Sequence, residues 1–192
     1  TFMCANLSSD SYRFFVRAGV TDPDEQRQLY DLLIECDGDF VPPLSFRRST
    51  TQAALSGSEH NPDGVRDYFN ALIAQHVVLC AGNGRIVGFL SFRPEYTCDA
   101  LSDGATYCYL STMAVSHACR GQHISPRLYR AAMDWAREHL PGRPVLLRTW
   151  STNRAQAHLM PELGFEEVLR LPNDRGCGVD TVYYRHENAP SA

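Results

Sequence analysis

The sequence lacks a long apolar run, a leader-like N-terminus and an excess of positive charge, and each absence narrows what the protein can be. No apolar stretch approaches the ~20 residues that a membrane-spanning helix needs. No basic segment followed by an apolar one opens the chain, so we expect neither a secretory signal peptide nor a membrane partner. Lys and Arg total 18 against 22 Asp and Glu, a formal net charge of −4 that disfavours nucleic acid as a partner.

Paired cysteine motifs are also missing. The chain has seven cysteines, and none lies in a CxxC or CxxH pair. This spacing offers no metal-binding pattern, and the odd number favours free thiols that are mostly buried. We therefore expect a reducing, cytoplasmic environment and no metal.

The composition and length fit one folded domain. Apolar residues make up 44% of the 192 residues and charged residues 21%, which is ordinary for a chain with a sizeable core. The sequence has no internal repeat and no low-complexity tract. We expect a single domain over residues 3–188, with residues 1–2 a remnant of cloning and residues 189–192 a tail.

Local patterns predict the element order β-α-α-β-β-β-α-β-α-β-β. Asp22-Pro23 and Asn61-Pro62 are typical helix openings, and Gly82-Asn83-Gly84 is typical of a hairpin turn. A loop is expected from Pro94 to Gly104. A hairpin core followed by strand–helix–strand crossovers predicts a mixed sheet with helices on both faces. Strands are predicted over 12–17, 77–81, 85–93, 106–115, 145–151, 165–171 and 181–186, and the later helices over 126–139 and 153–163.

The most informative stretch is a strand that ends at Met113-Ala114-Val115, followed by the turn 120–125 and a helix from Pro126. A tight turn that leads into a helix presents free backbone N–H groups and the positive end of the helix dipole, which suit a pyrophosphate. Arg120 adds a charge that can pair with phosphate. A surface arginine in an ordinary strand–turn–helix unit would give the same pattern.

Residues 77–186 resemble the GNAT N-acetyltransferase superfamily in three local patterns. The family motif Arg/Gln-x-x-Gly-x-Gly/Ala is matched by Arg120-Gly121-Gln122-His123-Ile124-Ser125. The family also has an Asn that opens a short helix eleven residues before Gly-Phe, as Asn153 and Gly164-Phe165 do here. The hairpin 77–93 fits as well, and we take 77–186 as the core of the resemblance.

The resemblance implies an α/β fold of the α+β type. Its sheet has about seven mostly antiparallel strands that splay into a V, and helices cover both faces. Acyl-CoA is implied to lie in the V between strands 106–115 and 145–151, with its pantetheine arm on the backbone of Met113, Ala114 and Val115. The pyrophosphate is implied to bind at Arg120, Gly121, Gln122, His123, Ile124 and Ser125. Asn153 is expected on the pantetheine side, although a simple helix N-cap explains it equally well.

Two departures from the family pattern concern the cofactor loop and acid catalysis. His123 stands where the motif has its first glycine, and Ser125 stands where Gly or Ala is usual. Met160 stands where many family members have a tyrosine that protonates the CoA sulfur, and it cannot do so. Some members place a glutamate base at the position of Tyr109, which makes Tyr109 our candidate catalytic residue. Packed aromatics with satisfied hydroxyls are an equally good interpretation.

The acceptor end is less well marked. Tyr107 shares one face with Tyr109 by strand alternation, and we expect it to contact the acceptor. The segment 40–48 (FVPPLSFRR) corresponds to a loop that often borders the acceptor site in the family, so we expect acceptor contact at Phe46.

The resulting functional hypothesis is transfer of an acetyl group from acetyl-CoA to a primary amine of a small molecule or peptide. The amine is expected to attack directly in a ternary complex, in a protein that is a monomer or homodimer. One alternative is a non-catalytic domain that binds or senses acyl-CoA. Another is a transferase that uses a longer acyl-CoA.

Overall fold

The computed structural model describes residues 11–57 and 59–188, so the expected remnant at 1–2 and the expected tail at 189–192 lie outside the described residues. The described chain alternates strands and helices in the order that the sequence predicts. The strands are β1 (Arg13–Ala18), β2 (His76–Gly82), β3 (Arg85–Thr97), β4 (Thr106–Val115), β5 (Val145–Trp150), β6 (Glu166–Leu171) and β7 (Thr181–His186). The helices are α1 (Pro23–Cys36), α2 (Gly64–Ile73), α3 (Ile124–His139) and α4 (Arg154–Glu162), with short 3₁₀ turns η2 (Asp37–Asp39), η3 (Leu44–Phe46) and η4 (His117–Cys119).

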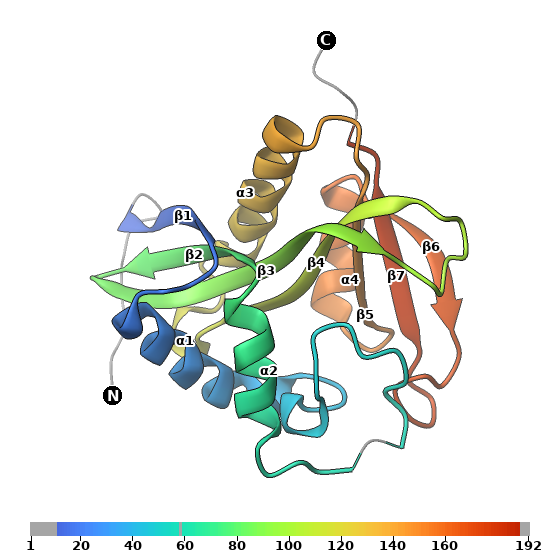
Figure 1. The fold of residues 1–192 in the computed structure, drawn as a ribbon, viewed down its shortest axis with the longest axis horizontal. Coiled ribbons are helices and arrows are strands. Elements are labelled where there is room, and N and C mark those ends of the chain that lie inside the picture. The colour runs from blue at the N-terminus through green and yellow to red at the C-terminus, as the bar shows by residue number, and fades with distance from the viewer. Residues whose placement is uncertain (1–10, 58, 189–192) are drawn as a thin grey trace.

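One sheet holds all seven strands in the order β1-β2-β3-β4-β5-β7-β6. Every neighbouring pair is antiparallel except β4 and β5, which are parallel. Helices α1 and α2 lie on one face and α3 and α4 on the other (Figure 1). The predicted mixed, mostly antiparallel sheet with helices on both faces is therefore confirmed.

The helices form where the sequence supplies their ends. At α1 the Asp22 carboxylate accepts hydrogen bonds from the backbone N–H groups of Asp24 and Glu25, both at 2.9 Å, and Pro23 occupies the first turn. These contacts satisfy donors that a helix N-terminus otherwise leaves free. Leu29, Leu32, Leu33 and Cys36 form the buried face of α1.

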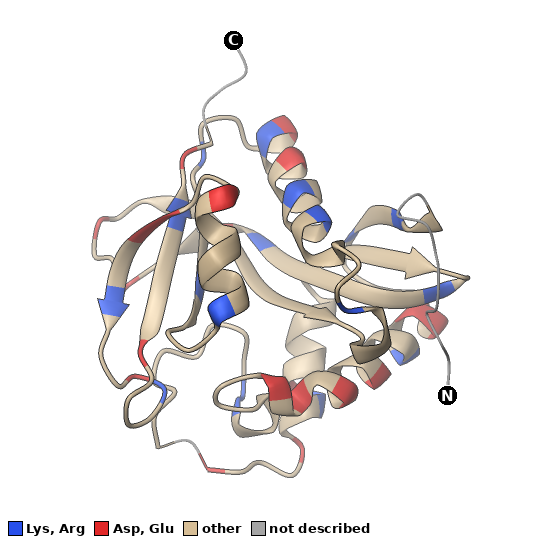
Figure 2. Cartoon of the chain, turned by 180° about the vertical axis from the view of Figure 1, so that it is seen from behind, with Lys and Arg blue, Asp and Glu red and all other residues tan. Residues whose placement is uncertain are grey.

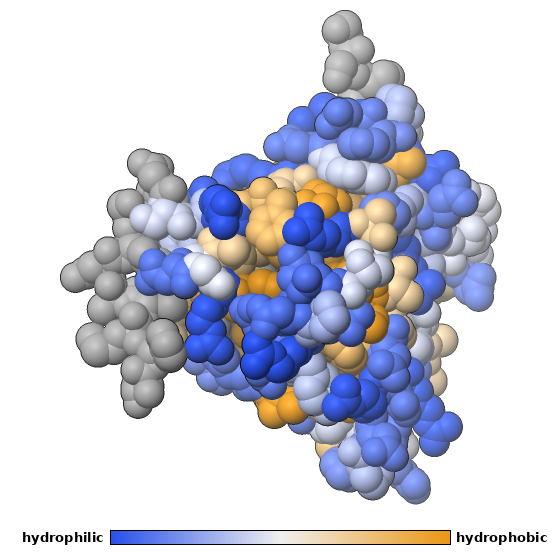
Figure 3. Space-filling model, turned by 60° about the vertical axis from the view of Figure 1, so that its left-hand side comes forward, coloured by the Kyte–Doolittle hydropathy of each residue, from blue (hydrophilic) through white to orange (hydrophobic). Residues whose placement is uncertain are grey.

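Apolar side chains pack in separate clusters on the two faces of the sheet. The cluster under α3 and α4 includes Leu110 and Leu147, and the cluster under α1 and α2 includes Phe89 and Ala114. Among the described residues, Ile34 alone is a large hydrophobic side chain in the exposed class, at 53%. The face in Figure 3 is hydrophilic around a central apolar area, and acidic residues follow α1 in Figure 2. In the part of the chain that the structure describes, no helix is long and apolar enough to cross a membrane.

The sheet opens between β4 and β5. The two strands pair only through Cys108–Val145, Tyr109–Leu146 and Leu110–Leu147, after which they diverge. β5 keeps its pairing with β7 along its whole length, so the opening leaves the facing edges of β4 and β5 without a ladder partner. This is the V that the resemblance implies.

A β-bulge at the point of divergence turns two polar side chains to the same face. Ser91 of β3 pairs with Thr112 and Phe92 pairs with Leu110, so Ser111 is the extra residue of β4. The Thr112 hydroxyl lies 2.6 Å from that of Tyr68, and the Ser111 hydroxyl donates to Gln75 Oε1 at 2.6 Å. Because a bulge interrupts the alternation of a strand, both side chains face α2 and its C-terminal end.

Two sequence-based expectations are wrong in detail. The loop expected from Pro94 begins later, because β3 continues to Thr97 across a register shift between Arg93 and Tyr96. A bulge is where a strand tolerates proline, since the missing N–H is not needed there. Cys119 is disulfide-bonded, whereas the free thiols are Cys36, Cys80, Cys98, Cys108 and Cys177.

Candidate active site

A cavity of about 870 Å³ fills the opening between β4 and β5. Its walls include Met113, Ala114 and Val115 from β4, as the sequence predicts, and residues 147–150 from β5. The N-terminus of α3, one side of α4 and the segment after α1 complete it. The predicted loop residues Arg120, Gly121, His123, Ile124 and Ser125 line it as well, and so does Asn153.

Gln122 is the member of the predicted phosphate loop that does not line the cavity. Its side-chain oxygen accepts a hydrogen bond from the Tyr12 hydroxyl, which holds the loop against the start of β1. Gln122 therefore supports the loop, and its neighbours form the surface that faces the cavity.

His123 is the N-cap of α3 and adopts a left-handed backbone conformation, with φ 55° and ψ 27°. It makes no side-chain cap hydrogen bond. A left-handed residue other than glycine costs roughly 1–2 kcal/mol. Glycine is usual at this position of the family motif because it adopts the left-handed conformation without strain. His123 adopts the same conformation at an energetic cost. Among the described residues no side chain caps the start of α3, so the N–H groups of its first turn can face an anion.

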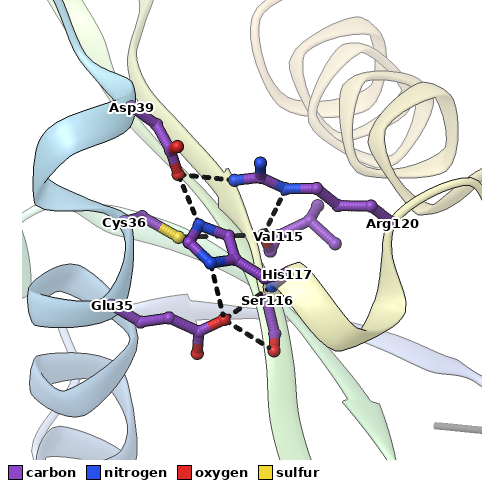
Figure 4. A network of polar contacts seen from close by, with 7 residues as sticks. All are labelled: Glu35, Cys36, Asp39, Val115, Ser116, His117 and Arg120. Atoms are coloured by element: carbon purple, nitrogen blue, oxygen red, sulfur yellow. Dashed lines mark hydrogen bonds and ion pairs between the residues drawn. The ribbon is translucent and has the colours of Figure 1, made fainter.

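Arg120 takes part in a polar network at the mouth of the cavity (Figure 4). Its Nη2 lies 2.5 Å from Asp39 Oδ2, and His117 Nε2 lies 2.8 Å from the same oxygen. Glu35 accepts from the His117 backbone N–H at 2.6 Å and from the Ser116 hydroxyl at 3.0 Å. Burial alone would raise the pKa of Asp39, but the hydrogen bonds from His117 and Arg120 lower it overall. The network ties the end of β4 and the phosphate loop to α1.

The same network contains a set of potential metal ligands. Atoms of Cys36, Asp39 and His117 lie within 4.8 Å of one another. Burial, with smaller contributions from Glu35 and Asp39, raises the pKa of the Cys36 thiol to about 12. The thiol lies 3.7 Å from the Val115 carbonyl oxygen, to which it donates. In this structure Asp39 pairs with both His117 and Arg120, and the Cys36 thiol is bonded to the end of β4.

Asn153 caps α4, as the simpler of its two interpretations predicts. Its Oδ1 accepts from the Gln156 backbone N–H at 3.2 Å, and its Nδ2 donates to Thr149 Oγ1 at 3.2 Å. The side chain is half-buried on the cavity wall. An N-cap that also faces the cavity is compatible with contact to a pantetheine arm.

Met160, which stands where many family members have the catalytic acid, does not line the cavity. Met160 is fully buried in the apolar cluster under α3 and α4. A different hydroxyl lines the cavity instead. Tyr129 of α3 is 3% exposed, and its oxygen accepts from Gln156 Nε2 at 2.7 Å, which leaves its own proton available for donation. Sequence reasoning missed Tyr129 because it lies on the buried face of an amphipathic helix, where an aromatic residue is read as core.

The candidate acceptor residues are not on the cavity wall. Tyr109 is 1% exposed and stacks on Tyr96 at 4.4 Å between ring centroids. Burial raises the pKa of Tyr109, and the nearby Arg148 opposes the shift. Tyr107 is fully buried, and its hydroxyl donates to Asp103. Phe46 packs edge-on against His60. The structure therefore does not bring these three side chains to the cavity.

The stretch 40–50, which contains Phe46, nevertheless forms one end of the cavity through other residues. Phe40, Arg47 and Thr50 line it, opposite Arg148, Trp150 and Arg175. The rings of Phe40 and Trp150 are 6.0 Å apart. The location of the loop was predictable from the sequence, and the side chains that it turns inward were not.

Hydroxyl and amide groups connect this end of the cavity to its surroundings. Gln75 accepts from the Ser111 hydroxyl at 2.6 Å and donates to Thr50 Oγ1 at 2.8 Å. Ser111, Thr112 and Thr50 all line the cavity. These hydrogen bonds fix the orientation of the polar groups at this end of the cavity.

The sequence profile of the acetyltransferase (GNAT) family matches residues 27–165. A GNAT-family protein from Desulfovibrio desulfuricans superposes with a TM-score of 0.66 at 14% identity, over 93% of this chain and 99% of that one. An aminoglycoside 6′-N-acetyltransferase complexed with coenzyme A gives 0.65 at 16% identity, with the same coverage of both chains. An N-acetyltransferase from Staphylococcus aureus gives 0.62 at 15%, over 92% and 99%.

No curated protein sequence matches the chain. Identities this low show a shared fold alone, whereas the family profile covers more than half of the sequence. Together with the open V and the turn before α3, this match shows that the chain belongs to the GNAT acetyltransferase family.

Proposed function

We propose that this protein transfers an acetyl group from acetyl-CoA to a primary amine of a small molecule or peptide, by direct attack in a ternary complex. The observation that carries the proposal is the continuous cavity that links the N-terminus of α3 to the space between residues 40–50 and β5. A donor and an acceptor can therefore enter from different ends and meet where β4 and β5 diverge.

The donor end suits coenzyme A. The pyrophosphate would lie against the free N–H groups at the start of α3, with Gly121 close and Arg120 able to exchange Asp39 for phosphate. The pantetheine amides would pair with the open edge of β4 at Met113 and Val115, and with Asn153 across the V. A structure of similar fold is complexed with coenzyme A, which supports coenzyme A as the kind of ligand.

Direct attack is favoured over an acetylated enzyme. The one free thiol that lines the cavity in the described residues is Cys36, and burial raises its pKa to about 12. A protonated thiol is a poor nucleophile, so Cys36 is unsuited to carry the acetyl group. In the direct reaction the amine nitrogen bonds to the thioester carbon, and the C–S bond breaks.

Tyr129 is our candidate for the acid that protonates the departing CoA thiolate. Burial raises its pKa, so the hydroxyl keeps its proton at neutral pH, and Gln156 holds its oxygen in place. The proton lost by the amine would pass to water in the cavity, whose wall there carries the hydroxyl groups of Ser111, Thr112 and Thr50. Tyr109 lies behind the wall, and we do not assign it the role of base.

The test is incubation with acetyl-CoA and a panel of primary amines, with acetylated products identified by mass spectrometry. The chain has no lysine, so acetylation of its own lysine side chains cannot consume the donor. Cys177 is exposed and would react with thiol reagents, which makes direct chromatography of CoA the better second readout. Tyr129→Phe should lower kcat while acetyl-CoA affinity stays unchanged.

Tight acetyl-CoA binding without product from any amine class would contradict the proposal and favour a sensing domain. Longer acyl-CoA donors in the same assay test the remaining alternative.

A further inference from the structure

Three arginines gather at the acceptor end of the cavity, from parts of the sequence far from one another. Arg47 follows η3, Arg148 lies on β5 and Arg175 precedes β7, and all three line the cavity. Arg47 is 7% exposed and Arg175 is 6% exposed. Their charges act on one another: burial, and then Arg47 and Arg148, lower the pKa of Arg175 to about 9. Burial likewise lowers the pKa of Arg47, but the guanidinium group of arginine keeps its charge in proteins.

None of the three forms an ion pair with another residue that the structure describes. Their hydrogen-bond partners are mainly backbone carbonyls of the segment between η2 and α2: Arg47 donates to Pro42 at 2.8 Å and 3.1 Å, Arg148 to Gln52 at 2.5 Å and Arg175 to Val41 at 2.7 Å.

Asp174 is an acid whose charge acts on Arg175. Its carboxylate accepts from the Thr181 hydroxyl at 2.5 Å, and that hydroxyl in turn accepts from Arg175 Nε at 3.0 Å. One indirectly linked carboxylate does not balance three guanidinium groups.

A role in holding the segment between η2 and α2 explains the hydrogen bonds to its carbonyl groups, but it does not explain why the three donors are charged. A neutral donor would hold the same carbonyls, whereas buried charges without counter-charges are strongly unfavourable. Arginine is the residue suited to planar, two-point binding of carboxylate and phosphate. The three guanidinium groups that face the cavity therefore lack an anionic partner, which a ligand could supply.

Resting on the proposed function, we infer that the acceptor is a small amine that also carries an anionic group, a carboxylate or a phosphate, held by Arg47, Arg148 and Arg175. The burial of two of these arginines beneath the segment after α1 favours a small molecule over a folded protein surface. The rings of Phe40 and Trp150 flank the site and lie near the guanidinium groups of Arg47 and Arg175, at 5.5 Å and 5.7 Å.

The cluster also acts on the reacting amine. Nearby positive charge disfavours an ammonium and so increases the share of neutral amine, which is the nucleophile. A polycationic acceptor, such as an aminoglycoside, would instead place several ammonium groups against the arginines. The site therefore selects against that acceptor class, although a protein of similar fold is an aminoglycoside acetyltransferase.

The experiment compares amines that differ only in the anionic group. Each amino acid in a panel of twenty is paired with its amide, and phosphoethanolamine is paired with ethanolamine, while kanamycin and spermidine represent cationic acceptors. We expect kcat/KM for at least one anionic amine to exceed that of its neutral partner at least tenfold. The two arms distinguish carboxylate from phosphate, and preference in either supports the inference.

Variants then connect the preference to the cluster. Arg148→Gln should lower kcat/KM for the preferred anionic amine about 10- to 100-fold, the scale of a charge-assisted hydrogen bond, and leave acetyl-CoA affinity unchanged. Arg148→Lys keeps the charge and loses the planar fork, so its kcat/KM should lie between those of wild type and Arg148→Gln. Arg143→Gln is the matched control, because Arg143 also donates to a carbonyl, that of Pro94 at 2.8 Å, but does not line the cavity.

The outcomes separate the two proposals. Acetylation of neutral or cationic amines with equal or higher kcat/KM than anionic ones would overturn the inference and leave the acetyltransferase proposal intact. No acetylation of any amine, with normal acetyl-CoA binding, would overturn the proposed function itself.

Discussion

Replacing His123 with glycine tests whether backbone conformation explains the glycine of the phosphate-loop motif. His123 has φ 55° and caps α3 without a side-chain hydrogen bond. Glycine would remove roughly 1–2 kcal/mol of left-handed strain, and its greater freedom in the unfolded chain would return about 0.4–1 kcal/mol. We therefore expect His123→Gly to stabilise the protein by up to about 1.6 kcal/mol. For a domain of this size each kcal/mol corresponds to a rise in Tm of about 2–4 °C.

The assay is thermal and urea unfolding of wild type and variant, with acetyl-CoA affinity measured by calorimetry. Asn83→Gly is the matched control, because Asn83 has φ 52° but asparagine tolerates this conformation, so little gain is expected. Since the His123 side chain is exposed, its removal should not weaken acetyl-CoA binding. A destabilised His123→Gly protein would refute the backbone argument, and a tenfold loss of affinity would show that the ring itself contacts the cofactor.

Three further predictions concern the same region. Asn153→Ala should cost about 1 kcal/mol through loss of the α4 cap, measured by urea unfolding, and contact with pantetheine would add a loss of acetyl-CoA affinity of ~1–2 kcal/mol in calorimetry. Met160→Tyr should destabilise the protein by ~1–3 kcal/mol, because the site is fully buried, and should not raise turnover. Faster turnover would show that a tyrosine at this position can act as the acid. Asp39→Asn should lower stability by less than about 1 kcal/mol at pH 7, because the pair is partly exposed. Since the folded-state pKa of Asp39 is lowered, this difference should vanish as pH falls through that value, and a difference that persists once Asp39 is fully protonated would contradict it.

The element order and the cofactor loop were predictable because they depend on local patterns. Helix openings such as Asp22-Pro23 and the hairpin turn at Asn83-Gly84 specify local geometry, and the motif at 120–125 sits between a strand and a helix. The acceptor end was not predictable in the same way. Arg47, Arg148 and Arg175 converge only because β5 diverges from β4 and the segment after α1 closes over the opening.

The sequence did not predict which individual side chains line the cavity. Tyr107 and Tyr109 do share one face of β4, but that face packs in an apolar cluster with Leu146 and Tyr183, and the bulge at Ser111 changes the alternation only for the residues after them. Tyr129 and Gln156 lie on different helices, and no sequence spacing indicates that they hydrogen-bond across the cavity.

The central claim is direct transfer between two ligands that occupy the cavity together. The most direct measurement is the initial rate with acetyl-CoA and the preferred amine varied against each other, with the intact mass of the protein recorded after incubation with acetyl-CoA alone. We predict intersecting double-reciprocal lines and an unchanged mass, because the Cys36 thiol stays protonated. Parallel lines with a protein heavier by one acetyl group would contradict the account.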